Sequence, residues 1–594
     1  MNLIFKKFSF LNKINFLLSK KSKKKYFFIY LSFVFISILE LVGISLIPVY
    51  FLFLIKTGDY KIFDNFEFLN KFINNISNNE LILYSSFILF FIFFFKNLFF
   101  FLANKYHNKF TAELVIELSN KIYNFYIQMP YNLYLLKNSS YLVNNLTYEI
   151  SNFRELIKDL VLVLREITFL LFFILFLFFY NFIVTFFIFL IMSFLSFIFF
   201  LIIKKPIAKK GLEVSINKKI LLNNLKQCFD LFKIVKIFNI ESDLKDTFNK
   251  TVSNSERYQA YMETLSSVPK YFLEVFVVLL LVIILQLSVI ANISSSEIIS
   301  LSIVIAIASV RLVPIFSSIS RCLTKIRFRI SSAEILYKEI TQYSKFPEIA
   351  DESISFTENK EELKNININF KDVDFFYIGS TNYVLSKVNI NIGPNAIIGI
   401  VGDSGSGKTT FLDLFTGLLK PSSGQILLNG ASIDKNLKSW QKKIAIIPQE
   451  IFLLDDSIKN NIFFFKNQNT FREKNYKEVL RISKLQDFIN TLDKKDDTLI
   501  GENGSRLSGG QKQRIGIARA LYHNKSILIL DEATNALDSN TEDKIINDIS
   551  LLKDGRIIFI VSHKYKNLRH CDKIFIFKNT GIKIANYSDL MIKD

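Results

Sequence analysis

The chain carries the stretch Gly402-Asp403-Ser404-Gly405-Ser406-Gly407-Lys408-Thr409-Thr410, directly after the apolar run 396–401. Such a Gly-rich turn between a strand and a helix lets successive backbone N–H groups point at phosphate oxygens. Lys408 is expected to reach the outer phosphates of a triphosphate, and the Thr409 hydroxyl to hold Mg²⁺. A plain Gly/Ser turn is the alternative, and it needs no flanking strand and helix. The stretch therefore predicts a phosphate-binding loop in an α/β domain.

The composition indicates a membrane protein. The 594 residues are 50% hydrophobic, with a formal net charge of +20. The apolar residues concentrate before residue 325, in runs long enough to cross a bilayer. Eight lysines precede the first run, which is typical of a cytoplasmic membrane flank, so we expect membrane lipids and no nucleic acid as the partner of this charge. The first run lacks a small-residue cleavage site and is predicted to be retained.

Six apolar segments predict six transmembrane helices, at about 26–55, 81–103, 160–180, 182–203, 270–291 and 297–319. The loops 104–159 and 204–264 are long, basic and helix-compatible, and the latter holds twelve Lys and Arg. By the positive-inside bias, both termini and both long loops of this multi-pass protein are cytoplasmic. In the outer loop 56–80 apolar residues recur at helical spacing. They predict an amphipathic surface helix, and packing against the spans is the alternative.

The predicted fold class is multidomain. Residues 1–342 are expected to form an all-α six-helix transmembrane domain. A polar stretch, 343–364, reads as a linker. In 365–594 short aliphatic runs alternate with helical patterns, so this part is predicted to be an α/β P-loop nucleotide-binding domain.

A second motif predicts two carboxylates beside the phosphate loop. The run 527–530 reads as a buried strand that ends in Asp531 and Glu532. Asp531 is expected to bind Mg²⁺ through water, and Glu532 to polarise the attacking water as a general base.

Another anion site is predicted where Ser508, Gly509 and Gly510 open a helix near Gln511. One domain does not need two sites for the same γ-phosphate. We therefore expect this surface to meet the nucleotide held by another copy of the chain.

The run Leu507-Ser508-Gly509-Gly510-Gln511 resembles the signature of the ATP-binding cassette (ABC) family. The resemblance implies ATP and Mg²⁺ as ligands, and it implies roles for four further residues. Tyr377 corresponds to the aromatic residue that stacks on adenine, and Gln449 to the glutamine that contacts Mg²⁺ and the attacking water. Asp538 lies in the loop that crosses the dimer, and His563 corresponds to the histidine that contacts the γ-phosphate.

Six spans followed by such a domain resemble the half-transporters of ABC exporters. Glu502, in Gly501-Glu502-Asn503-Gly504, is similar to their loop at the coupling helices. The resemblance implies a homodimer with two composite ATP sites in the bacterial inner membrane. It also implies that Tyr134 to Asn152 and Gln227 to Lys250 carry the coupling helices.

The substrate is argued from ionisable side chains in the spans, because a charge in hydrocarbon costs at least ~2.5 kcal/mol and normally faces the protein interior. Lys96, Lys270 and Arg311 are the candidate substrate residues. Lys270 lies four residues before Glu274, and mutual neutralisation is the alternative there. Arg311 has no local acidic partner in its own span. Six such cations in a dimer predict an anionic head group such as a phosphate or pyrophosphate.

Three short stretches, 40–48, 268–274 and 311–314, resemble spans of bacterial lipid-linked oligosaccharide flippases of the protein N-glycosylation type. This resemblance implies that a polyprenyl-pyrophosphate glycan moves from the cytoplasmic to the outer leaflet. The alternatives are an exporter of another lipid, a drug or a peptide, and a regulatory ATPase or channel that transports nothing.

Overall fold

A computed structural model of the chain describes residues 2–55, 78–180, 182–290, 295–343, 366–464 and 471–591. The helix predicted in 56–80 and the predicted linker 343–364 lie almost entirely outside the described residues. The chain forms two compact units. Unit 1 comprises Met1–Met129 and Lys137–Ala350, and unit 2 comprises Pro130–Leu136 and Asp351–Asp594.

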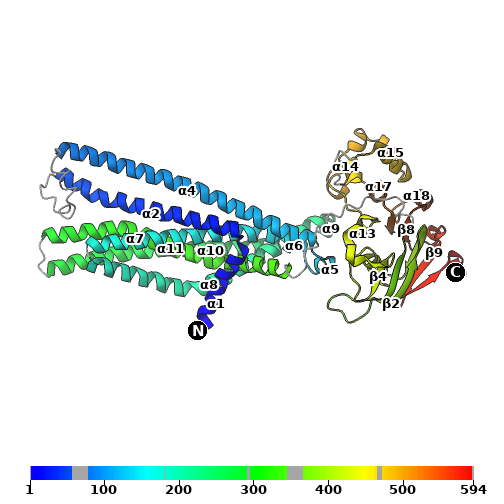
Figure 1. Cartoon of the computed structure of the whole chain (residues 1–594), viewed down its shortest axis with the longest axis horizontal. Helices are drawn as coiled ribbons and strands as arrows, with labels where there is room; N and C mark the ends of the chain where they lie inside the picture. Colours follow the sequence, from blue (N-terminus) through cyan, green and yellow to red (C-terminus); the bar gives the residue numbers. More distant parts are fainter. Residues whose placement is uncertain are drawn as a thin grey trace. The chain divides into compact units, whose positions relative to one another are not determined.

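Unit 1 is a bundle of long helices (Figure 1). Its helices are α1 (Asn2–Leu17), α2 (Lys20–Ile55), α4 (Asn78–Gln128), α6 (Ser139–Asn144), the π-helix η2 (Asn145–Glu149), α7 (Ile150–Tyr180), α8 (Phe182–Asp230), α9 (Phe232–Phe238), α10 (Glu241–Ile290) and α11 (Ser295–Tyr343). α11 packs against α7, α8 and α10, while α2 packs against α4 and α7. Each predicted span overlaps one of the six long helices. The sequence did not predict α1, which buries Ile14 and Leu17.

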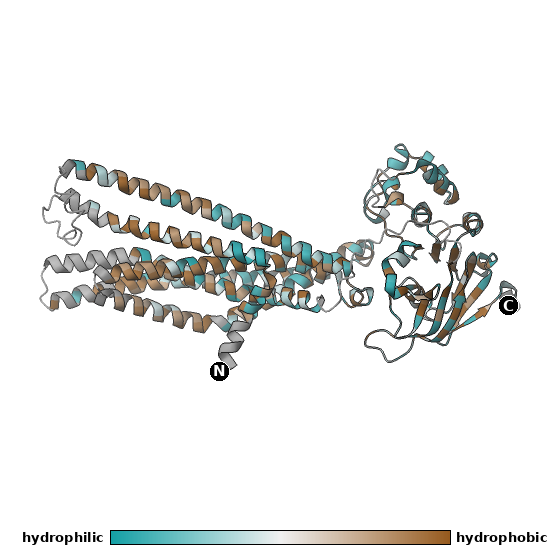
Figure 2. Ribbon diagram, in the orientation of Figure 1, coloured by the Kyte–Doolittle hydropathy of each residue, from teal (hydrophilic) through white to brown (hydrophobic). Residues whose placement is uncertain are grey.

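The long helices have one largely hydrophobic part and one largely hydrophilic part. In Figure 2, α4 is largely hydrophobic over its first half and hydrophilic over its second. Within the described residues, three stretches are long and apolar enough to cross a membrane: Lys20–Leu46, Ile82–Gln128 and Ser139–Phe178. A bent pair, Phe189–Ile203 with Lys205–Asp230, would make a fourth. The predicted spans 270–291 and 297–319 are not among these stretches, so the number six remains a prediction.

Unit 2 contains two β-sheets (Figure 1). The first is antiparallel, in the order β2-β1-β4-β5, and the second has the order β10-β9-β3-β8-β7-β6. The strands are β1 (Ile368–Phe375), β2 (Leu385–Ile392), β3 (Ala396–Gly402), β4 (Ser423–Leu428), β5 (Ala431–Ser432), β6 (Ile444–Ile447), β7 (Ile527–Asp531), β8 (Ile557–Val561), β9 (Lys573–Lys578) and β10 (Gly581–Ala585). In the second sheet all neighbours from β9 to β6 are parallel, and β10 is an antiparallel edge.

Helices cover both faces of the parallel sheet. They are α5 (Tyr131–Tyr134), α12 (Lys408–Phe415), α13 (Leu437–Lys442), α14 (Ile458–Phe463), α15 (Glu473–Ile482), α16 (Gln486–Asn490), α17 (Gly509–Tyr522), α18 (Ser539–Ser550) and α19 (Tyr587–Met591), with short 3₁₀ turns η4 (Ile433–Asn436), η6 (Lys495–Asp497), η7 (Glu502–Gly504) and η8 (Tyr565–Leu568). α5 is the first segment of unit 2 along the chain. It ends at Tyr134, the first residue of the stretch expected to carry the first coupling helix, whereas α9 lies inside the second stretch.

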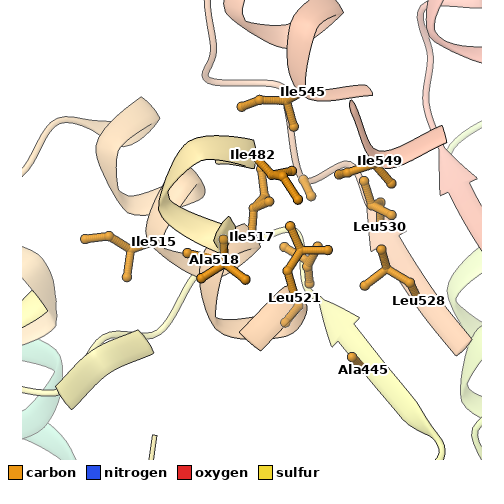
Figure 3. Packing of buried hydrophobic residues seen from close by; sticks show 14 of the residues in the cluster. Ala445, Ile482, Ile515, Ile517, Ala518, Leu521, Leu528, Leu530, Ile545 and Ile549 are labelled. Atoms are coloured by element: carbon orange, nitrogen blue, oxygen red, sulfur yellow. The ribbon is translucent and has the colours of Figure 1, made fainter. Parts of the chain in front are cut away.

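Side chains of the central strands alternate between two cores, as the period of a strand requires. Leu528 and Leu530 face a core formed with α15, α17 and α18, where Ile517 and Leu521 pack toward them (Figure 3). The intervening Ile529 faces the opposite core, which includes α12 and the antiparallel sheet. Burial on both faces explains why these strands read as continuous apolar runs.

Candidate functional site

The predicted catalytic residues lie at the carboxyl ends of four adjacent parallel strands. β3 runs into the phosphate loop, and β8 is followed by Ser562 and His563. β7 ends at Asp531, and β6 is followed by Pro448 and Gln449. Because carboxyl ends of parallel strands share one edge of a sheet, residues more than a hundred positions apart in sequence meet there.

The loop 402–410 has a backbone that suits an anion. Gly402 has φ +154°, and a Cβ on it would lie 2.8 Å from both the Phe577 carbonyl oxygen and Ser406 Oγ. Gly407, at φ +98°, directly precedes α12. Ser406 Oγ is buried and lacks a hydrogen-bond partner within the described part of the chain. A glycine cradle with an unpaired hydroxyl at a helix start fits a phosphate group.

Lys408 lies across the same loop. Its Nζ donates to the Gly402 carbonyl at 2.6 Å and to the Asp403 carbonyl at 3.0 Å. The ammonium therefore sits over the cradle, where a phosphate would take the place of these carbonyl contacts. Beside it Thr409 is exposed, whereas Thr410 is buried.

Asp531 is placed in a field that disfavours its ionised form. Burial, and next the charge of Glu532, raise the pKa of its carboxyl, while the Lys408 ammonium acts in the opposite direction. A bound divalent cation would reverse this balance. Asp531 and the Thr409 hydroxyl are oxygen donors of the kind that Mg²⁺ prefers, so the donor set fits the predicted ion.

Glu532 is the centre of a hydrogen-bonded cluster. Its Oε2 accepts from Gln449 Nε2 at 3.0 Å and from Asn535 Nδ2 at 2.9 Å, and its Oε1 lies 3.0 Å from His563 Nε2. The backbone of Glu532 has φ +50°, a strained conformation for a residue with a Cβ. Gln449, Glu532 and His563, all predicted, thus meet at the Glu532 carboxylate. The Glu532 side chain is 14% exposed.

Asn535 was not among the predicted site residues. The sequence shows an asparagine three positions after Glu532, a spacing that places both side chains in one turn. Only the observed contact assigns it to the cluster.

The signature residues form a capping box at the N-terminus of α17. Ser508 caps α17 through the Gln511 N–H, and the Gln511 side chain accepts in return from the Ser508 N–H at 2.8 Å. A Cβ on Gly510 would lie 3.0 Å from the Ala536 carbonyl oxygen. Gly509 and Gly510 thereby allow the close approach of the loop that leads to Asp538.

Asp538 caps the next helix, since its carboxylate accepts from the Thr541 N–H at 3.0 Å. That hydrogen bond lowers the pKa of Asp538. The Ala536 N–H donates to Gln513 Oε1 at 2.8 Å, so the Asp538 loop is tied to α17. Of the hydrogen bonds and ion pairs in the described ranges, none joins residues 402–410 with residues 508–511.

Tyr377, the predicted adenine contact, stands beside the phosphate loop. Its hydroxyl lies 3.0 Å from Thr410 Oγ1, and its ring meets Phe375 edge-on with centroids 5.0 Å apart. The Tyr377 side chain also borders a cavity of about 290 Å³ inside unit 2. The other residues around this cavity are Asn132, Leu135, Leu136, Phe375, Phe376, Ile378, Leu419, Lys420 and Ser422.

The charged residues of unit 1 pair across helices. Arg311 was expected to have no local acidic partner in its own span, and its Nη1 lies 3.0 Å from Glu40 Oε1 on another helix. The same Glu40 oxygen is 3.5 Å from Lys96 Nζ. The reason is tertiary, because α2, α4 and α11 contribute one member each.

Lys270 also has an acidic neighbour. Its Nζ is 3.9 Å from Glu274 Oε1, and both side chains are at least half exposed. Each of the three candidate cations therefore has a carboxylate within 4.0 Å, which lowers the net charge of the six cations expected in a dimer. Two cations share one carboxylate, and the third forms an i,i+4 pair, as the alternative reading held.

This chain is similar to known proteins in sequence and in fold. Residues 385–535 match the family model described as ABC transporter. The chain is 31% identical over 402 residues to a Rickettsia typhi protein named for export ATP-binding and permease functions, an alignment that covers 65% of this chain and 66% of that protein. The chain thus spans just under two thirds of the length of such curated relatives.

One further relative matches part of the chain in sequence, and one solved structure matches its fold. An ATP-dependent lipid A-core flippase of Vibrio parahaemolyticus is 35% identical over 229 residues, covering 38% of this chain and 39% of that protein. The solved structure of a bacterial Atm1-family ABC exporter with ATP bound matches with a TM-score of 0.76 at 18% identity, over 97% of both chains. Residues 385–535 thus form an ABC transporter domain, and the chain as a whole has the fold of the solved exporter structure.

Proposed function

We propose that this protein is an ATP-driven ABC exporter that hydrolyses ATP in order to move an anionic amphipathic lipid across a membrane. The observation that carries the hydrolytic part is the cluster at Glu532. A carboxylate fixed by Gln449 and Asn535, beside His563 and the phosphate loop, suits a general base for an attacking water. A protein that only senses nucleotide does not need this set.

The residues have separate roles in this chemistry. Lys408 and the loop amides hold the phosphates, and Tyr377 flanks the adenine. Thr409, Gln449 and Asp531 would hold Mg²⁺, which would neutralise charge on the transferred phosphate. Glu532 accepts the proton of the water, and His563 donates a hydrogen bond toward the γ-phosphate.

A homodimer is part of the proposal. The signature opens α17, which packs on α14 and α15, whereas the phosphate loop opens α12 on the other face of the sheet. One site assembled from both elements therefore requires two copies. The segment around α9 supports this, because its apolar side chains are exposed: Phe229 by 69%, Phe232 by 53%, Ile237 by 65% and Phe238 by 69%.

For the substrate we propose a polyprenyl-pyrophosphate-linked oligosaccharide that moves from the cytoplasmic to the outer leaflet of the bacterial inner membrane. Lys96 and Arg311 share Glu40, so this group keeps a net charge of +1 per copy. Arg311 has five N–H donors, and its single short contact with Glu40 leaves donors for a pyrophosphate. Lys270 contributes less because Glu274 offsets it. The relative named as a lipid A-core flippase supports a lipid substrate.

Reconstitution in liposomes distinguishes a glycolipid flippase from an exporter of a drug or peptide and from a regulatory ATPase. Proteoliposomes with a fluorescent polyprenyl-pyrophosphate glycolipid in one leaflet are expected to show ATP-dependent translocation, and Glu532→Gln is the hydrolysis control. Translocation of a neutral drug or peptide instead, with none of the glycolipid, would contradict the substrate assignment. ATP hydrolysis without transport of any of these would favour the regulatory ATPase.

A further inference from the structure

The chain passes between unit 1 and unit 2 three times. The boundaries fall after Met129, after Leu136 and after Ala350, because the short segment Pro130–Leu136 belongs to unit 2. Any displacement of unit 2 that is transmitted along the chain must therefore enter unit 1 at these passages.

Residues beside the first two passages contact one buried carboxylate on α11, the last helix before the third boundary. Glu339, on α11, lies eleven residues before the third boundary. Its two oxygens are 3.0 and 2.9 Å from the Nζ of Lys137, the first residue after the second boundary. Tyr126, three residues before the first boundary, donates from its hydroxyl to Glu339 Oε2 at 3.3 Å.

Further contacts hold this cluster together. The Tyr141 hydroxyl donates to Glu339 Oε1 at 2.6 Å, and Asn145 Nδ2 donates to the Tyr126 hydroxyl at 2.8 Å. The Glu339 side chain is only 5% exposed and that of Lys137 14%. A buried carboxylate with an ammonium and two hydroxyl donors fixes its neighbours far more firmly than a surface ion pair does.

The segment between the first two passages packs inside unit 2. It contains α5, whose Tyr131 lies against the core of the antiparallel sheet. The pKa of the Tyr131 phenol is raised by burial and next by the charge of Asp413, which lies on the phosphate-loop helix α12. The segment held by Lys137 thus reaches the helix that carries the nucleotide loop.

We propose that Glu339 is a positioning residue that makes the end of α4, the segment after α5 and α11 move as one body, so that nucleotide-driven changes in unit 2 are transmitted to the helices of unit 1. Without this carboxylate, the end of α4, the segment after α5 and the end of α11 would be displaced independently of one another. Unit 2 would then hydrolyse ATP while the membrane helices follow incompletely. Such coupling presupposes that ATP hydrolysis drives transport, as proposed above.

The test is amide hydrogen–deuterium exchange of the full chain in lipid nanodiscs, with and without ADP and vanadate. In the unsubstituted protein we expect trapping to change exchange in unit 2 and also in peptides of α8 and α10. In Glu339→Gln the change in unit 2 is expected to persist, while that in α8 and α10 is lost. This readout needs no substrate, so it distinguishes failure of the coupling role from a wrong substrate.

A matched control lies on the same helix. Glu334 pairs with Lys13 at 2.7 Å, but its partner is on α1 and not at a passage. Glu334→Gln is expected to transmit the change to α8 and α10 as the unsubstituted protein does. Equal loss in both variants would mean a general loosening of α11 and would overturn the proposal, as would full transmission in Glu339→Gln.

A milder variant covers the case in which Glu339→Gln fails to fold. Tyr126→Phe with Tyr141→Phe removes two hydroxyl donors and keeps both rings. We expect transport of the pyrophosphate glycolipid per ATP hydrolysed to fall by roughly 2- to 30-fold, the range of known coupling changes. An unchanged ratio, together with unchanged exchange in α8 and α10, would overturn the role of the cluster.

Discussion

The Glu532 carboxylate lies 3.0 Å from His563 Nε2, although the two residues are carried by different strands of the parallel sheet. Gln449 binds the other oxygen of the same carboxylate at 3.0 Å. Replacement of Glu532 by Gln keeps the size of the side chain but removes the base. We expect ATP hydrolysis to fall by about 10²- to 10⁴-fold, with ATP binding retained.

Phosphate release and binding of a fluorescent ATP analogue are the two measurements for this variant. Glu473→Gln is a suitable control, because the Glu473 side chain is 70% exposed and lies outside the cluster. Hydrolysis at the normal rate in Glu532→Gln would remove Glu532 from the role of base.

If each ATP site is built from two copies, two damaging substitutions should have different effects when they lie on different copies of a dimer and when they lie on the same copy. Lys408→Ala damages the phosphate loop, and Gly510→Asp puts a carboxylate at the signature, against the Ala536 carbonyl. If one variant is on each copy, both defects fall in one site and the other stays intact, so about half of the ATPase activity is expected. With both variants on one copy, each site carries a defect and activity is lost. Equal rates for the two mixed dimers would argue for sites formed within one chain.

Arg311 is expected to matter more for transport than for hydrolysis. Arg311→Ala removes the cation that Glu40 holds at 3.0 Å, and it leaves that carboxylate facing Lys96 alone. Translocation of the pyrophosphate glycolipid should fall further than ATP hydrolysis does in the same proteoliposomes. Lys270→Ala serves for comparison, since the Glu274 neighbour offsets its charge, and a smaller loss is expected. A parallel loss in both variants, or none in Arg311→Ala, would contradict this ranking.

Asp413 predicts a pH dependence of stability. Burial, and next the charge of Asp531, raise the pKa of Asp413 from 3.8 to about 6. Since the pKa is higher in the folded state, its stabilising contribution is full below about pH 3.8 and is lost as the pH rises through about 6. Asp413→Asn should therefore raise the unfolding midpoint of unit 2 at pH 7 and change it little near pH 4. Calorimetry of the full chain at both values checks this, and an equal shift at the two pH values would disagree.

Phe411 is expected to be a large contributor to the core of unit 2. It is fully buried on α12, and its ring meets those of Phe370, Phe559, Phe575 and Phe577. Phe411→Ala leaves a cavity at this point and should cost about 3–5 kcal/mol of unfolding free energy.

A thermal melt of unit 2 followed by near-UV circular dichroism measures the loss. The 75% exposed Phe452 provides the comparison, because Phe452→Ala should stay within about 0.5 kcal/mol. Similar midpoints for the two variants would show that the aromatic cluster adds little.

Local signals in the sequence predicted the catalytic half well. The runs 396–401, 444–447, 527–530 and 557–561 are all strands, because buried parallel strands are continuously apolar. Gln449, Asp531 and His563 end or follow such a run, so chain order alone predicted that they share one edge of the sheet, whereas Tyr377 follows β1. The first strand, β1, was missed because its polar residues interrupt the apolar pattern.

The charged residues of the helices were less predictable. The expectation for Arg311 considered acidic residues only in its own span, and its partner Glu40 is 271 positions away. Which faces of α2, α4 and α11 point toward one another depends on packing between helices, and no periodicity in one helix records it. The same holds for Glu339, whose partners come from three other segments.

The sequence by itself determined that this chain has apolar helices followed by a nucleotide-binding α/β domain, because hydrophobic periodicity and Gly-rich loops act over short stretches. Only the tertiary structure decided which charges are paired and that Asn535 joins the Glu532 cluster. It also decided that Tyr126 and Lys137, beside two passages of the chain, both contact Glu339. The physical reason is that ion pairs and hydrogen bonds between distant segments depend on how the helices and strands pack.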